Sequence, residues 1–284
     1  LGDVYKRQFF SRITGGIFLK TGISTACLYP LETEKALELL LEEGFRHFEI
    51  FFNTFSEIEP AFVKRLKNLL DTYHATVKSV HPFTSGYEPY LIFTDYTRRF
   101  RDTLDFYERY FETAANLGAQ LLVIHGDRKT PQNGISNQDY FEKFGELSLR
   151  AEQYGVTAAQ ENVNMFRSQH PAFLETMRNY LGERAKFVFD IKQAVRSGND
   201  PAAVCRAMGK GLVHIHMNDN TPANDCVLPG KGTMDYRAVL SILREIGYCG
   251  DFIIEVYRKS FGEVLELKTA MKHINALLKT STCE

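Results

Sequence analysis

The sequence predicts a single α/β domain folded as a (β/α)8 TIM barrel. Short runs rich in β-branched and aromatic residues recur eight times along the 284 residues, and segments with helical spacing separate them. Strict alternation of nearly continuous apolar strands with helices is typical of a parallel sheet covered by helices. Eight such units in a chain of this length favour one closed barrel.

The eight predicted strands are short apolar runs that fit a barrel better than an open sheet. An open doubly wound sheet is the alternative architecture, but no GxGxxG follows the first run and no segment resembles a P-loop, so we favour the barrel. In chain order the runs are GISTACLY (22–29), FRHFEIFF (45–52), ATVKSVH (75–81), AQLLVIH (119–125), GVTAAQE (155–161), KFVFDI (186–191), LVHIHM (212–217) and DFIIEVY (251–257).

Proline, glycine and capping residues mark the ends of the helical segments. Pro30 and Pro201 stand where a first helical turn would begin, and Ser56 with Glu59 has the spacing of a capping box. Glycines that follow helical segments are expected to end them. These glycines are Gly44, Gly118, Gly155, Gly182, Gly209 and Gly247.

No linker divides the chain, so we expect one domain over residues 9–284. The opening LGDVYKRQ (1–8) has no periodicity leading into the first strand and is interpreted as a possible foreign or truncated lead. Longer segments at 82–96, 126–136 and 218–232 are expected to be βα loops able to cover a site.

Composition favours a small-molecule substrate. The net charge is -1, with 34 basic and 35 acidic residues well mixed, so there is no electrostatic footprint for a nucleic-acid partner. No apolar run approaches the roughly 18 to 20 residues of a membrane span, and no signal peptide is recognised. The five cysteines are scattered without a CxxC pair, which predicts free thiols and a cytoplasmic location.

Polar residues lie at or near the ends of six of the eight predicted strands. Each alone has an ordinary structural explanation, since a strand-end carboxylate is most often a helix cap and a single histidine a hydrogen-bonded core residue. Six together at the mouth of a barrel, where parallel strands end and active sites lie, would leave buried charges uncompensated unless a cation held them. The six are His81, His125, Glu161, Asp190, His216 and Glu255.

Four of these residues form a candidate metal site. Glu161, Asp190, His216 and Glu255 offer three carboxylates and one imidazole. This mostly hard ligand set suits one divalent ion, Mn²⁺, Mg²⁺, Co²⁺ or Zn²⁺, and does not distinguish among them. His214 faces the same side one layer deeper, where a structural hydrogen bond is the expected role.

With these residues identified, the chain resembles the xylose-isomerase-like TIM barrels. This superfamily includes sugar-phosphate isomerases and epimerases, ketose 3-epimerases, inosose isomerases and dehydratases, and endonuclease IV. The resemblance extends from about residue 20 to about residue 278. The resemblance rests on the motifs QENVN around Glu161, FDIKQA around Asp190, HIHMND around His216, PGKGTMDY after the seventh strand and IIEVY around Glu255.

The resemblance implies a metal-dependent proton transfer. Glu161, Asp190, His216 and Glu255 would bind the ion, and Glu161 and Glu255 would act as a catalytic acid/base pair on a metal-stabilised enediolate. Strands 5 and 8 lie three apart around an eight-membered ring, so these glutamates could flank a ligand. The predicted activity is isomerisation or epimerisation of a small sugar, sugar phosphate or keto-polyol.

Other residues are expected to bind the substrate. His81 and His125 would line the same mouth, and Gln193 could hydrogen-bond a sugar oxygen. Lys231, between two glycines, is a candidate for a phosphate or carboxylate contact, although a solvated loop lysine explains it equally well. Aromatic side chains could form the walls, although packing under loops explains each of them. They are Phe51, Phe52, Phe83, Tyr87, Phe166 and Tyr257.

Three alternatives remain open. An inosose-type dehydratase would use the same first step and then expel a β-hydroxyl. An endonuclease IV-like AP endonuclease is disfavoured, because Gln193 replaces a metal-binding histidine of that branch and the loop NTPANDCVLPG lacks its Asp-x-His pair. The third is a non-catalytic sugar-binding barrel. Homo-oligomerisation is possible, but no sequence feature identifies an interface.

Overall fold

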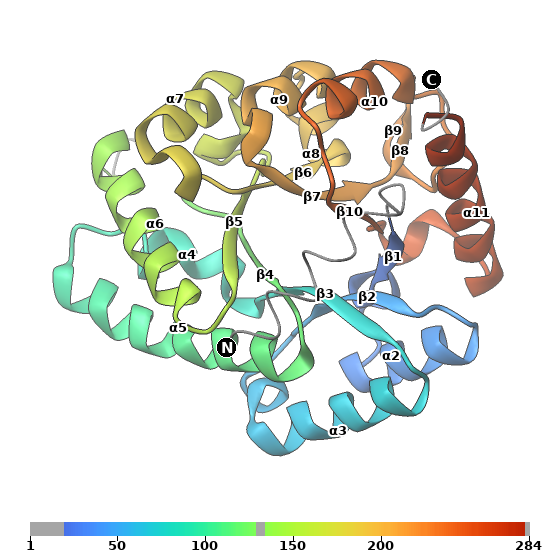
Figure 1. Ribbon diagram of the computed structural model, residues 1–284, viewed down its shortest axis with the longest axis horizontal. Helices are drawn as coiled ribbons and strands as arrows, with labels where there is room; N and C mark the ends of the chain where they lie inside the picture. The colour runs from blue at the N-terminus through green and yellow to red at the C-terminus, as the bar shows by residue number, and fades with distance from the viewer. Residues whose placement is uncertain (1–19, 129–133, 282–284) are drawn as a thin grey trace, which may run out of the picture.

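The predicted barrel is confirmed. The computed structural model describes residues 20–128 and 134–281, with side chains to residue 279, so the predicted lead 1–8 and part of the loop 126–136 lie outside the described residues. Parallel strands close into one barrel in the order β1-β10-β7-β6-β5-β4-β3-β2 (Figure 1). The barrel strands are β1 (Thr21–Ser24), β2 (His47–Phe51), β3 (Thr76–His81), β4 (Leu121–Ile124), β5 (Thr157–Glu161), β6 (Phe187–Asp190), β7 (Leu212–Met217) and β10 (Asp251–Ile254).

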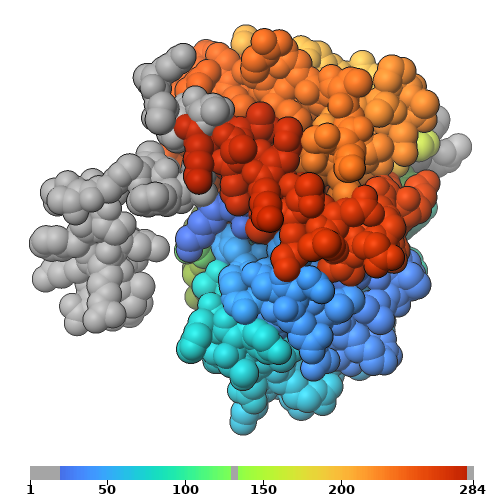
Figure 2. Space-filling model, turned by 90° about the vertical axis from the view of Figure 1, so that its right-hand side faces the viewer, coloured from blue at the N-terminus to red at the C-terminus, as the bar shows by residue number. Residues whose placement is uncertain are grey.

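Helices form a ring around the barrel (Figure 1). The last helix closes this ring against the first described strand and helix, because Lys268 Nζ lies 3.3 Å from Glu43 and Thr21 Oγ1 donates to Asn275 (Figure 2). The helices are α2 (Thr33–Glu42), α3 (Pro60–Thr72), α4 (Glu88–Leu91), α5 (Thr97–Leu117), α6 (Asn137–Glu152), α7 (Pro171–Leu181), α8 (Ile191–Arg196), α9 (Pro201–Met208), α10 (Tyr236–Glu245) and α11 (Val264–Ser281).

Helix boundaries confirm the glycine predictions and correct two others. Pro201 begins α9 and all six predicted stop glycines have positive φ, a conformation that glycine adopts without strain. Pro30 precedes α2 by three residues, so that prediction was wrong. The capping box at Ser56 was also wrong, because a 3₁₀ helix, η2 (Phe55–Ile58), occupies this segment and α3 begins at Pro60.

The segment 218–232 contains a structure that the sequence did not predict. It forms a two-stranded antiparallel sheet, β8 (Asp219–Thr221) and β9 (Asn224–Val227). The buried Asp219 carboxylate accepts backbone N–H bonds from Gly230, Gly232 and Met234 and so fixes the end of this segment. The loop after β7 is therefore an ordered part of the barrel mouth.

Strand periodicity explains why the predicted site residues face the barrel axis. Successive strand residues point to opposite faces, so each site residue lies above the interior residue two positions earlier. Val123, Ala159 and Val188 make a small apolar cluster inside the barrel, directly below His125, Glu161 and Asp190. This layer supports the polar site at the carboxyl ends of the strands.

Among the described residues, no helix is long and apolar enough to cross a membrane. The cysteines within the described part of the chain, Cys27, Cys205, Cys226 and Cys249, are free thiols, as expected. Cys283 lies outside the described residues.

Candidate functional site

The four predicted metal ligands converge at the mouth of the barrel. Glu161 and Asp190 end β5 and β6, His216 lies in β7, and Glu255 directly follows β10. One potential ligand atom from each side chain lies within 4.8 Å of the others. A register shift between Phe187 and Val188 brings Asp190 beside His216 on the neighbouring strand. The residues are thus close enough to share one ion.

Two buried atoms in this cluster have no hydrogen-bond partner within the described residues. His216 Nδ1 lies 3.4 Å from an oxygen of Glu161 and 3.4 Å from one of Glu255. Glu161 Oε2 is the other, although His125 Nε2 lies 3.0 Å away, out of line for a hydrogen bond. Buried polar atoms are rarely left without partners, so these two fit a bound cation.

Asp190 is both a helix cap and a member of the cluster. Its Oδ1 accepts bonds from the Gln193 backbone N–H and from Asn218 Nδ2, while Oδ2 lies 3.8 Å from His216 Nδ1. The Asn162 amide bonds both the N–H and the carbonyl of Asp190. Capping through one oxygen leaves the other directed at the cluster.

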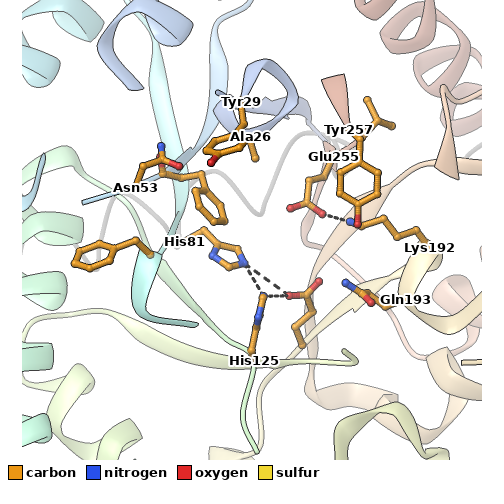
Figure 3. Close-up of a pocket in the computed structure, with 13 residues that line it drawn as sticks. Ala26, Tyr29, Asn53, His81, His125, Lys192, Gln193, Glu255 and Tyr257 are labelled. Atoms are coloured by element: carbon orange, nitrogen blue, oxygen red, sulfur yellow. Dashed lines mark hydrogen bonds and ion pairs between the residues drawn. The ribbon is translucent and has the colours of Figure 1, made fainter. Parts of the chain in front are cut away.

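Lys192, for which the sequence indicated no role, also enters this site. Its Nζ lies 2.5 Å from Asp190 Oδ2 and also contacts Glu255 Oε2. Figure 3 shows Lys192 beside Glu255 and Tyr257, with His81 and His125 across the cavity. Burial opposes the charge, but the two carboxylates outweigh it and hold the pKa of Lys192 well above its usual value.

The two glutamates have different electrostatic surroundings. Burial opposes ionisation of Glu161, but His125, His216 and His81 outweigh burial and hold its pKa well below the usual value. Burial raises the pKa of Glu255, against the attraction of Lys192. Groups whose environments separate their pKa values in this way are typical of acid/base pairs.

Glu49, in β2, holds the cluster from below and was missed by the sequence analysis. Its Oε2 lies 3.0 Å from His216 Nε2, accepts a bond from Ser79 Oγ and lies 3.4 Å from His214 Nε2. His214 also contacts Ser79, as expected of a structural histidine. The signal in the sequence was an acid in the middle of the apolar run FRHFEIFF.

His81 and His125 meet at the rim of the site. Their Nε2 atoms are 2.9 Å apart, so one ring donates and the other accepts. His81 stacks on Phe51, with ring centroids 4.5 Å apart. His81, His125 and Glu161 form a second group of potential ligand atoms that shares Glu161 with the first.

A cavity of about 530 Å³ opens over these residues (Figure 3). Its walls include Phe51, Phe83 and Tyr257, as predicted, together with Tyr29 and Asn53. The other predicted wall residues do not line it, because Phe52 and Phe166 are buried in the fold and Tyr87 is exposed. Concave sites with aromatic walls and a few converging polar groups are typical of small-molecule binding.

Gln193 and Lys231 differ in where the structure places them. Gln193 lines the cavity, and its Oε1 accepts the Asn164 backbone N–H, which leaves the amide NH₂ for a cavity ligand. Lys231 is exposed and does not line the cavity. Its charge instead helps to lower the pKa of Glu266, at the start of α11, after the backbone N–H groups of Glu263 and Gly262. The structure therefore brings seven of the eight predicted site residues together.

The chain is similar in sequence to other proteins over much of its length. An uncharacterised protein of Mycobacterium leprae is 26% identical over 277 residues, covering 89% of this chain and 94% of its relative. An inosose isomerase of Bacillus velezensis is 27% identical over 199 residues, covering 63% of this chain and 69% of the isomerase.

A solved structure shares the fold. The crystal structure of a D-tagatose 3-epimerase-like protein superposes with a TM-score of 0.76 at 22% identity, covering 93% of this chain and 98% of that one. Residues 37–277 match the family model described as a xylose isomerase-like TIM barrel. The chain therefore belongs to the xylose isomerase-like TIM barrel family.

Proposed function

We propose that this protein is a divalent-metal-dependent isomerase or epimerase of a small sugar, sugar phosphate or keto-polyol. The observation that carries the proposal is the convergence of Glu161, Asp190, His216 and Glu255 within 4.8 Å of one another. Two of them, Glu161 and Glu255, line a cavity of small-molecule size. The two unpartnered atoms in this cluster support a resident cation.

The two glutamates would exchange protons with the substrate. Glu161 and Glu255 both line the cavity and come from strands three apart in the ring, so a substrate held between them meets a carboxylate on each side. One carboxylate removes a proton from a carbon beside a carbonyl, and the other returns a proton to the opposite face. When bound, a divalent ion would act as a Lewis acid toward the substrate carbonyl and a neighbouring hydroxyl.

Hydrogen-bonding side chains would orient the substrate. The His81–His125 pair and the Gln193 amide lie at the same cavity and offer hydrogen bonds to hydroxyl groups. Phe51, Phe83 and Tyr257 cover apolar faces of a ring or chain and limit access of water to the reacting carbon. The sequence similarity of this chain to an inosose isomerase supports keto-polyols as candidate substrates.

The test is solvent-deuterium incorporation. Protein purified without added ions is analysed for metal, then incubated with a panel of ketoses, ketose phosphates and inososes in D₂O with each of the four candidate ions. We expect deuterium at a carbon beside the carbonyl, with a new epimer or isomer. Loss of water from an inosose would instead indicate a dehydratase. Metal-loaded protein that labels no candidate, and nicks abasic DNA, contradicts the proposal.

A further inference from the structure

Lys192 is the feature of this site that the proposed proton transfer does not use. Among the described residues that line the cavity, it is the only lysine or arginine. Its side chain is 4% exposed, and its ammonium contacts two of the four candidate ligands, Asp190 and Glu255. A buried cation placed on two members of a metal site requires its own explanation.

The charges of the candidate ligands call for a second cation. Glu161, Asp190 and Glu255 bring three negative charges into a buried cluster. A divalent ion balances two of them, and an unbalanced buried charge is strongly unfavourable. Lys192 supplies the missing positive charge from within the chain. The four candidate ligands, a divalent ion and Lys192 then carry no net charge, and without the ion Lys192 still offsets one of the three ligand carboxylates.

Lys192 has more hydrogen-bond donors than its two carboxylate partners use. A lysine ammonium has three N–H groups and no acceptor. The Asp190 and Glu255 carboxylates account for two of them. Tyr257, whose ring centroid lies 5.7 Å from Nζ, covers the ammonium on another side and itself lines the cavity. One N–H therefore remains for a ligand in the cavity.

We propose that Lys192 is a second cation of the active site, which donates a hydrogen bond to the substrate oxygen that becomes negative during proton transfer. This rests on the proposed function. In that step a glutamate takes the proton, the C–H electron pair forms a carbon–carbon double bond, and the carbonyl oxygen takes the charge. Donors directed at such an oxygen are worth about 10² to 10³ in rate.

Metal affinity tests the charge argument without any substrate. Lys192→Met removes the ammonium from two ligand carboxylates, so we expect Mn²⁺ to bind at least roughly tenfold more tightly at mildly alkaline pH. Lys259→Met is the control, because the exposed Lys259 lies 6.0 Å from the same Tyr257 ring. An unchanged Mn²⁺ dissociation constant in folded Lys192→Met overturns the proposal.

Turnover tests the donor argument on any substrate that the wild type labels with deuterium. We expect Lys192→Met to lower kcat by about 10² to 10³ with KM changed only a few-fold. Lys192→Ala should recover part of kcat with added methylammonium or ethylammonium and none with neutral methanol. Full kcat in Lys192→Met, or no rescue of Lys192→Ala, overturns the role.

Two further comparisons keep the outcomes separate. Circular dichroism checks that each variant is folded, and Lys192→Arg, which retains the charge, replaces Lys192→Met in both measurements if the latter does not fold. Lys192→Arg should retain Mn²⁺ affinity within a few-fold of wild type, and tenfold tighter binding contradicts the charge argument. If the wild type labels no ketose or inosose, the proposed function fails, while the Mn²⁺ comparison still tests Lys192.

Discussion

Glu49 Oε2 lies 3.0 Å from His216 Nε2, and both side chains are fully buried. A carboxylate at this distance accepts the Nε2–H of the imidazole, so Nδ1 is the ring nitrogen that faces Glu161 and Glu255. Carboxylate–histidine pairs of this kind orient metal-binding histidines in many proteins. A register shift between Phe48 and Glu49 in β2 sets Glu49 opposite Ser79. From this position the Glu49 carboxylate contacts His216 below the site.

Glu49→Gln tests this orientation. The amide can donate to Nε2 as readily as accept from it, so the favoured tautomer is lost and Nδ1 carries a proton in part of the molecules. We expect the affinity for Mn²⁺ to fall roughly 10- to 100-fold, measured by titration calorimetry. Glu38→Gln, at an exposed position of α2, should leave the affinity unchanged. Equal affinities in Glu49→Gln and wild type would show that His216 needs no partner.

Glu255→Gln tests the proposed acid/base role of Glu255. Glutamine keeps the shape of the side chain but cannot accept a proton, so we expect deuterium incorporation to fall by between about 10² and 10⁴ on whichever substrate the wild type labels. Glu263→Gln, on the exposed loop before α11, is the matched control. Activity at the wild-type level would remove Glu255 from the catalytic pair.

The sequence predicted the barrel and most of the site because both depend on local patterns. The C-terminal end of each apolar run is visible in the sequence, and a closed parallel barrel brings those ends to one rim. His81, Asp190 and His216 could therefore be placed together without knowing any tertiary contact, and the structure does bring them to that rim. Their chemical roles remain predictions.

The residues that were missed depend on geometry between strands and loops. Glu49 reaches His216 across the barrel interior, between strands that are not neighbours in the sheet. Lys192 bends back over the first turn of α8 to Asp190, and a flexible four-carbon stem gives no periodic signal. Lys231 failed to reach the cavity because Asp219 fixes the adjoining turn.

Gln193→Leu tests the proposed substrate contact of this cavity residue. Leucine removes the amide donor from the cavity and the acceptor of the Asn164 N–H. We expect KM to rise by roughly tenfold while kcat changes less, because the lost bond holds the substrate equally in its ground and transition states. Initial rates over a range of substrate concentrations measure both. A selective loss of kcat would instead assign Gln193 a part in proton transfer.

Glu88 predicts how the stability of the fold depends on pH. Burial raises the pKa of this carboxyl from its usual 4.5 to about 7, against the attraction of His125. It accepts bonds from the Gly126 N–H and the Tyr107 hydroxyl. Between these two values the folded protein holds a proton that the unfolded chain releases, so the free energy of unfolding falls as pH rises through this window. The loss from this group reaches up to about 3 kcal/mol.

Glu88→Gln should remove that part of the pH dependence. Glutamine mimics the protonated carboxyl, since its carbonyl can accept the Gly126 N–H while its amide faces Tyr107. Urea unfolding at pH values below and above the window gives the difference from wild type. Asp127, whose pKa burial raises to about 6, contributes with the same sign, so only the change relative to wild type is diagnostic. Glu112→Gln, exposed on α5, should follow the wild type. If Glu88→Gln loses as much stability with rising pH as the wild type does, Glu88 is ionised throughout, and the shift arises elsewhere.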